Sequence, residues 1–173
     1  MLMKTKILDC TLRDGGYYTN WDFSSDVVKT YIETTNKLPV DYLEVGYRNK
    51  PTKEYMGKFG YTPVSILKKL RKSSNKKLAV MLNEKSTLPE DLDELLTPIK
   101  GLANMVRLDV DPKNFERAVV LAKAVKAMGF EVAFNTMYMS KWSTEYKGFL
   151  DNLSEINGVA DLFCMVDSFG GIT

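Results

Sequence analysis

The chain has 173 residues, 45% of them hydrophobic, and its 24 basic and 22 acidic side chains leave a formal net charge of +2. This size suits one domain with its own core, and the near-balance of charge argues against nucleic acid or an anionic membrane as a partner. The apolar runs are too short to span a bilayer and no signal-peptide pattern follows Lys6, so we expect a cytoplasmic protein.

Six short apolar runs rich in β-branched residues predict strands. They recur about every 30 residues, the size of a βαβ unit. Their apolar character is near-continuous rather than alternating, which suits strands covered on both faces. In chain order the predicted strands are Lys6–Cys10, Tyr42–Gly46, Leu78–Leu82, Met105–Val110, Glu131–Phe134 and Leu162–Val166.

Helical patterns fill the gaps between the strands, and each begins at a capping residue or a proline. The first is expected to run to about Lys37, and Gly129 and Gly158 stop the last two. The predicted starts are Ser24 or Ser25, Thr62 followed by Pro63, Pro89, Asp111 followed by Pro112, and Ser143 or Thr144.

Strict alternation of strands and helices predicts a parallel sheet, either closed as a barrel or open and doubly wound. Polar residues follow almost every predicted strand, and in a barrel these strand ends converge on one mouth. We therefore predict an α/β fold of the (β/α)8 TIM-barrel type. Residues 1–173 are expected to be the N-terminal part of one catalytic domain and to supply about the first six strands. The first and sixth strands would then be sheet edges, which leaves a homo-oligomer open.

The chain has no histidine and two cysteines. Acid–base or metal chemistry within it must therefore use carboxylates, arginine, tyrosine or cysteine, or else residues beyond Thr173. Cys10 and Cys164 fall in apolar strand-like runs, which predicts buried free thiols rather than a disulfide.

The most informative segment is Thr11-Leu12-Arg13-Asp14-Gly15-Gly16, at the end of the first predicted strand. Asp14 offers a hard oxygen ligand to a divalent cation, and Arg13 offers a planar fork for a carboxylate or a developing enolate oxygen. The two glycines are expected to turn the backbone sharply. A salt bridge at a strand end followed by a Gly-Gly turn explains the same residues without any function, so the residues alone leave both explanations open.

Other polar residues at strand ends are weaker candidates. Asn83 and Asn135 follow the third and fifth strands and could contact a substrate, or could simply satisfy loop backbone. Asp109 could face the lumen of the barrel or pair with Arg107.

Three segments together resemble the pyruvate-carboxyltransferase-like superfamily of TIM-barrel metallolyases, which includes hydroxymethylglutaryl-CoA lyase, isopropylmalate synthase and homocitrate synthase. Residues 11–15 resemble its first-strand signature, residues 42–46 its second strand ending in Glu-Val-Gly, and residues 166–171 its sixth strand with Asp-Ser/Thr-x-Gly. The resemblance runs along essentially the whole chain. The member closest in type is 4-hydroxy-2-oxovalerate aldolase.

The resemblance implies a role for each matching residue. Asp14 is a ligand of a divalent cation, Mg²⁺ or Mn²⁺, and Arg13 stabilises the enolate of a 2-oxo acid. Glu44 and Asp167 lie in the same mouth, and Ser168 is expected to contact the substrate. The remaining metal ligands of the family, a His-x-His pair on the seventh strand, would lie beyond Thr173.

The chain departs from the family just after Arg-Asp-Gly. The aldolases carry a histidine there that is assigned acid–base work, and the synthases carry a glutamate–glutamine pair. This chain has Gly16 or Tyr17 at the comparable position. Tyr17 could donate a proton, or could only pack over the mouth.

The resemblance therefore implies a divalent-metal-dependent aldolase or lyase, which breaks or forms a C–C bond next to a 2-oxo acid through an enolate. An acyl-CoA condensing synthase of the same superfamily is the alternative enzyme. A third possibility is that the chain by itself is a catalytically inert segment of a larger protein.

Overall fold

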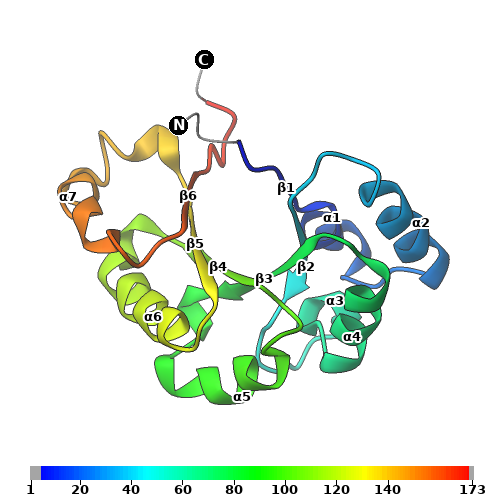
Figure 1. Ribbon diagram of the computed structural model, residues 1–173. Coiled ribbons are helices and arrows are strands. Elements are labelled where there is room, and N and C mark those ends of the chain that lie inside the picture. The colour runs from blue at the N-terminus through cyan, green and yellow to red at the C-terminus, as the bar shows by residue number, and fades with distance from the viewer. Residues whose placement is uncertain (1–4, 172–173) are drawn as a thin grey trace.

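The computed structural model describes residues 5–171 and is built around a parallel sheet with the strand order β1-β2-β3-β4-β5-β6. Figure 1 shows that the sheet curls. The strands surround an inner, concave face, and the helices lie on the outer, convex face. The strands are β1 (Leu8–Asp9), β2 (Tyr42–Tyr47), β3 (Lys77–Asn83), β4 (Met105–Val110), β5 (Glu131–Thr136) and β6 (Leu162–Met165).

The strand order follows the chain without reversal, so the described sheet has no topological switch point of the doubly wound kind. This confirms a parallel α/β fold curled like part of a TIM barrel, while the closed eight-stranded barrel stays a prediction. Self-association through the outer strands β1 and β6 also stays a prediction. No helix within residues 5–171 is both long enough and apolar enough to cross a membrane.

The predicted strands all occur, but β1 is shorter than the predicted Lys6–Cys10. The Asp9 carboxylate ends it early, because it accepts hydrogen bonds from the Thr11 backbone N–H at 3.0 Å and the Tyr31 hydroxyl at 2.5 Å. The chain therefore turns directly from strand into helix at this point.

The helices that cover the sheet include short ones that the sequence pattern does not predict, such as α3. Ser24 caps α2 as predicted, accepting a hydrogen bond from the Val27 backbone N–H at 3.3 Å. The helices are α1 (Thr11–Thr19), α2 (Ser25–Thr35), α3 (Lys58–Tyr61), α4 (Val64–Ser73), α5 (Leu92–Leu96), α6 (Phe115–Ala127) and α7 (Lys147–Asp151). Short 3₁₀ segments are η1 (Glu84–Ser86), η2 (Pro89–Asp91), η3 (Thr97–Ile99), η4 (Pro112–Asn114), η5 (Met139–Lys141) and η6 (Leu153–Ile156).

Two predicted helix starts are wrong. Thr62 does not cap α4: it has a left-handed backbone that ends α3, and Pro63 takes the cap position. The last helix does not begin at Ser143 or Thr144, because the Thr144 backbone N–H is used in a turn with the Lys141 carbonyl, and α7 starts only at Lys147.

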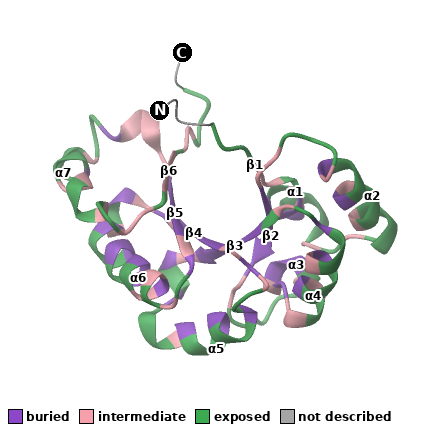
Figure 2. Cartoon of the chain, in the orientation of Figure 1, coloured by how far each residue is buried: buried purple, intermediate pink, exposed green. Residues whose placement is uncertain are grey.

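The central strands of the sheet are buried along most of their length (Figure 2), and the two faces of the sheet differ in what they bury. The face toward the helices is apolar, with fully buried residues that include Leu43, Leu78, Val80, Leu108 and Phe134. The concave face holds a small cluster of Tyr42, Ala79, Met105 and Ala133. Paired residues of parallel strands share a face, and side chains alternate along a strand. The concave face therefore also receives Glu44, which pairs with Ala79, and Arg107, two residues after Met105.

The Gly15-Gly16 pair does not form the predicted sharp turn, because both residues lie inside α1. The chain reverses instead at Asn20 and Trp21, which have left-handed backbones. The Trp21 indole then folds back onto the helix and donates a hydrogen bond to the Arg13 carbonyl at 2.9 Å. Gly16 is needed for this close approach, since a Cβ there would lie 2.0 Å from the Trp21 ring.

We expect Gly16→Ala to lower the free energy of unfolding by about 1–3 kcal/mol, because the overpacked Trp21 must move and take its hydrogen bond with it. Gly15→Ala is the matched control: a Cβ there would meet only the Phe23 ring at 3.9 Å, so the variant should gain slightly from helix propensity. Chemical denaturation of both variants checks this. Equal stability of the two would show that Trp21 does not pack as described.

Candidate active site

A buried carboxylate lies between two guanidinium groups on the concave face of the sheet. Glu44 of β2 is fully buried and accepts hydrogen bonds from Arg13 Nε at 2.7 Å and Arg107 Nη1 at 2.8 Å. Arg13 extends from the first turn of α1 and Arg107 from β4, and they are only 9% and 6% exposed. We call these three residues the Arg–Glu–Arg cluster; it carries a surplus of one positive charge.

The electrostatics of the cluster keep Arg13 charged. Burial alone lowers the pKa of its guanidinium, but the charge and hydrogen bond of Glu44 outweigh burial and raise the pKa above its ordinary value. A buried cation held in a fixed orientation is the arrangement that stabilises negative charge developing on a bound molecule.

Arg107 is oriented by a second polar partner. Asn135 of β5, itself 8% exposed, accepts a hydrogen bond from Arg107 Nη2. Arg107 Nε is buried and has no hydrogen-bond partner among the described residues. The predicted site residue Asn135 thus lies beside the cluster and orients Arg107; direct contact of Asn135 with a substrate stays a prediction.

Asp109 lies in the row of residues just beyond the cluster, beside Asn83 and Asn135 in the strand register. Burial raises the pKa of its carboxyl, although the positive charges of Arg13 and Lys85 act in the opposite direction. Asp109 is therefore more easily protonated than an aspartate in water.

Asp14 sits at the edge of this cluster, with a side chain that is 54% exposed. Its Oδ1 accepts a hydrogen bond from Arg13 Nη1, and its Oδ2 accepts one from the Cys10 thiol at 3.1 Å. Burial and the nearby Asp14 carboxylate raise the pKa of Cys10 to about 11, so this thiol stays protonated at neutral pH. Cys10 and Cys164 are free thiols, as predicted, but they are half-buried rather than buried.

The described residues do not make up a metal site by themselves. Within residues 5–171, no group of three His, Cys, Asp or Glu side chains is placed to hold an ion. Asp14 is the one predicted carboxylate ligand, and both of its oxygens already accept hydrogen bonds.

Tyr17 lies at the outer edge of the Arg–Glu–Arg cluster, which we call its rim. The residue is 61% exposed, and its hydroxyl lies 2.8 Å from the hydroxyl of Tyr47. Burial and the Tyr17 hydrogen bond raise the pKa of Tyr47, so Tyr47 stays neutral. The Tyr47 ring in turn lies 6.0 Å from the Arg13 guanidinium. Tyr17 is therefore linked to the cluster through one intervening tyrosine, and its role in proton transfer stays a prediction.

Three other predicted residues accept hydrogen bonds from loop backbone. The Asn83 side chain accepts one from the Lys85 N–H at 2.9 Å, Ser168 Oγ from the Tyr138 N–H at 3.1 Å, and Asp167 from the Gly171 N–H at 3.2 Å. The first and third bonds shape the loops after β3 and β6, and the second joins the loop after β6 to the loop after β5. The proposed contacts of these side chains with a substrate stay predictions.

Arg107 and Asp109 are the residues to which the sequence analysis gave too little weight. The signal was present in Met105-Val106-Arg107-Leu108-Asp109, where charges alternate with apolar residues inside a buried strand. Alternation places both charged side chains on the face opposite the helices. Two charges on the inner face of a buried strand indicate a polar lumen.

Comparison with solved structures finds a match to the N-terminal domain of a "putative aldolase" from Bacteroides vulgatus, with 70% sequence identity and a TM-score of 0.95. The match covers 98% of this chain and 56% of that one, so this chain spans little more than half of that structure. The likeness supports an aldolase-like fold. No protein-family model and no curated protein matches the sequence.

Proposed function

We propose that this chain carries the enolate-stabilising part of an aldolase, which breaks or forms a C–C bond next to a 2-oxo acid. The observation that carries the proposal is the buried Arg–Glu–Arg cluster on the concave face of the sheet. The likeness to the N-terminal domain of the B. vulgatus "putative aldolase" supports the same class of enzyme. The type closest to the motifs is a 4-hydroxy-2-oxo acid aldolase.

Arg13 has the central role in this proposal. In aldol cleavage the electron pair of the C3–C4 bond moves into the 2-oxo acid, and negative charge collects on the oxygen at C2 as an enolate. A charged guanidinium held by Glu44 and Asp14 meets that charge without having to reorganise. Glu44 and Asn135 act as positioning residues, because they hold the two guanidinium groups in place.

Proton transfer is assigned to the rim of the cluster. The substrate's 4-hydroxyl must lose a proton as the aldehyde leaves, and C3 of the enolate must gain one. Tyr17 is the proposed proton donor to C3, since its hydroxyl is exposed at the rim and bonded to a neutral tyrosine; water takes up the proton of the 4-hydroxyl and returns one to Tyr17. Asp167 and Ser168, after β6, and Asn83, the last residue of β3, are proposed to contact the substrate.

The resemblance to the metallolyases adds a divalent cation, Mg²⁺ or Mn²⁺, with Asp14 as one ligand and the other ligands outside residues 5–171. Such an ion would polarise the ketone oxygen of a 2-oxo acid. We expect Asp14→Ala to weaken Mn²⁺ binding at least about tenfold, because losing even an outer-shell partner of a metal costs that much.

Calorimetric titration of Mn²⁺ into the whole protein that the gene encodes checks this expectation. We call this whole protein the gene-encoded protein. Asp151→Ala is the control, since Asp151 is an exposed carboxylate at the end of α7. Unchanged affinity in the Asp14→Ala protein would remove Asp14 from the proposed ligand set.

Substrate turnover tests the function as a whole. The gene-encoded protein should release an aldehyde and a 2-oxo acid from a 4-hydroxy-2-oxo acid when Mn²⁺ is present. Consumption of acyl-CoA instead, with no aldehyde released, would identify the condensing synthase. The 173-residue chain assayed alone addresses the third possibility, because metal-dependent cleavage by it would refute inertness.

A further inference from the structure

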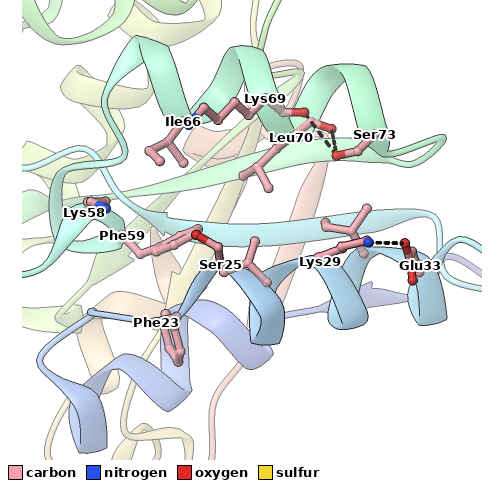
Figure 3. Close-up of a pocket in the computed structure, with 12 residues that line it drawn as sticks. Phe23, Ser25, Lys29, Glu33, Lys58, Phe59, Ile66, Lys69, Leu70 and Ser73 are labelled. Carbon is pink, nitrogen blue, oxygen red and sulfur yellow. Dashed lines mark hydrogen bonds and ion pairs between the residues drawn. The ribbon is translucent and has the colours of Figure 1, made fainter.

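We infer that a groove on the outer, helical face binds a small amphiphile with an apolar tail and an anionic head, such as a medium-chain fatty carboxylate. The groove lies between α2 and α4 and has a volume of about 340 Å³. Figure 3 shows the two helices as its walls, with β2 behind them. This places it on the face of β2 opposite the Arg–Glu–Arg cluster, so it is separate from the proposed active site.

The interior of the groove is apolar. Its deepest residues are Ile32 of α2, Phe59 of α3 and Leu70 of α4, which are 2–3% exposed, and Val28 and Ile66 extend the same surface outward on the two walls. An apolar concave site of a few hundred Å³ with a small number of polar groups is the usual form of a small-molecule site. The interior therefore suits an aliphatic chain.

Aromatic rings line one end of the groove. Phe23 and Phe59 lie at that end in Figure 3, and their ring centroids are 5.5 Å apart with the rings at an angle of 79°. A short alkyl chain can end against these rings.

The rim of the groove is positively charged. Lys29 stands on the α2 wall, Lys69 on the α4 wall and Lys58 near the aromatic end (Figure 3). The one acidic residue of the lining is Glu33, which lies 3.9 Å from Lys29 in an i,i+4 pair. Among the described residues, neither Lys58 nor Lys69 forms an ion pair. Two uncompensated cations beside an apolar floor favour an anionic head over a neutral or cationic one.

The inference is tested with decanoate, used below its micellar concentration. The control ligand is decyltrimethylammonium, which has an alkyl tail of the same length and a positive head. Calorimetry should show one saturable decanoate site, and amide shift changes in NMR spectra should fall on α2 and α4. The double variant Lys58→Gln/Lys69→Gln should weaken decanoate about three- to tenfold, since each exposed ion contact is worth up to about 1 kcal/mol. Lys123→Gln, on the exposed side of α6, should have no effect.

Ile66→Trp provides a second test, because the larger side chain fills the groove and should abolish decanoate binding. Three results would overturn the inference. One is no saturable decanoate binding to the wild-type protein. Another is equal affinity for the cationic ligand, with the lysine variant unchanged. The third is a dimer in sedimentation that Ile66→Trp dissociates while decanoate does not bind, which would assign the groove to a second copy of the chain.

Discussion

Replacing Glu44 with glutamine is expected to lower the free energy of unfolding by about 3–5 kcal/mol, because the change leaves the buried Arg107 guanidinium without a counter-charge and leaves Arg13 with only the half-exposed Asp14. Glutamine keeps the size of the side chain, so the loss reports charge rather than a cavity. Glu44 is fully buried and hydrogen bonded to both arginines, so water does not take the place of its carboxylate. Denaturant unfolding monitored by circular dichroism measures the effect.

The control is Glu54→Gln, which makes the same chemical change in an exposed loop and should alter stability by less than about 0.5 kcal/mol. Adding Arg107→Met to Glu44→Gln should recover part of the loss, since the buried cation that lost its counter-charge is then removed. A loss below about 1 kcal/mol for Glu44→Gln, with no recovery in the double variant, would contradict the buried Arg–Glu–Arg cluster.

Arg13→Lys is expected to reduce kcat/KM for aldol cleavage by about 10²–10³, the loss that follows removal of one oxyanion donor. Lysine keeps the positive charge beside Glu44, so the fold should be retained, but it lacks the planar fork that bonds Glu44 and Asp14 together. The loss should fall mainly on kcat, because the negative charge that Arg13 meets develops only as the C–C bond breaks.

Arg71→Lys serves as the matched control, because Arg71 of α4 hydrogen bonds to the nearby Ser74 and Lys76 backbone carbonyls on the outer face. Its kcat/KM should equal that of the wild-type protein. If Arg13→Lys raised KM while leaving kcat unchanged, Arg13 would bind the ground state of the substrate and the enolate role would be wrong.

The strands were well predicted because their signal is local. Runs such as Met105–Val110 combine β-branched and apolar residues over the length of one strand, and β4 has those bounds. The sequential strand order does not follow from the βα alternation alone, which suits a doubly wound sheet equally well; the polar residues at the strand ends favoured it.

The segment after β1 was predicted less well, because its structure depends on a distant contact. Gly15-Gly16 has the composition of a turn, yet the segment is helical and Gly16 accommodates the Trp21 ring. The glycine at position 16 is structurally required, but for close packing against Trp21 rather than for a turn. Nothing in the local pattern separates these two uses of glycine.

The candidate site was likewise predicted in part: its local motifs were found, and its long-range partner was not. Arg13, Asp14 and Glu44 were found from their motifs, and the structure joins all three by hydrogen bonds. The second guanidinium, Arg107, comes from 63 residues beyond Glu44, and only the sheet register brings the two together. Long-range partners of this kind need the three-dimensional arrangement.

The most direct test of the central claim is exchange of the methyl protons of pyruvate, the simplest 2-oxo acid, for deuterium. Exchange requires an enolate and needs no aldehyde partner, so it isolates the step assigned to Arg13. Proton NMR of pyruvate in D₂O with the gene-encoded protein and Mn²⁺ should show exchange well above the buffer rate, and Arg13→Lys should reduce it about 100-fold or more. Exchange at the buffer rate, or an equal rate in the Arg13→Lys protein, would contradict the account.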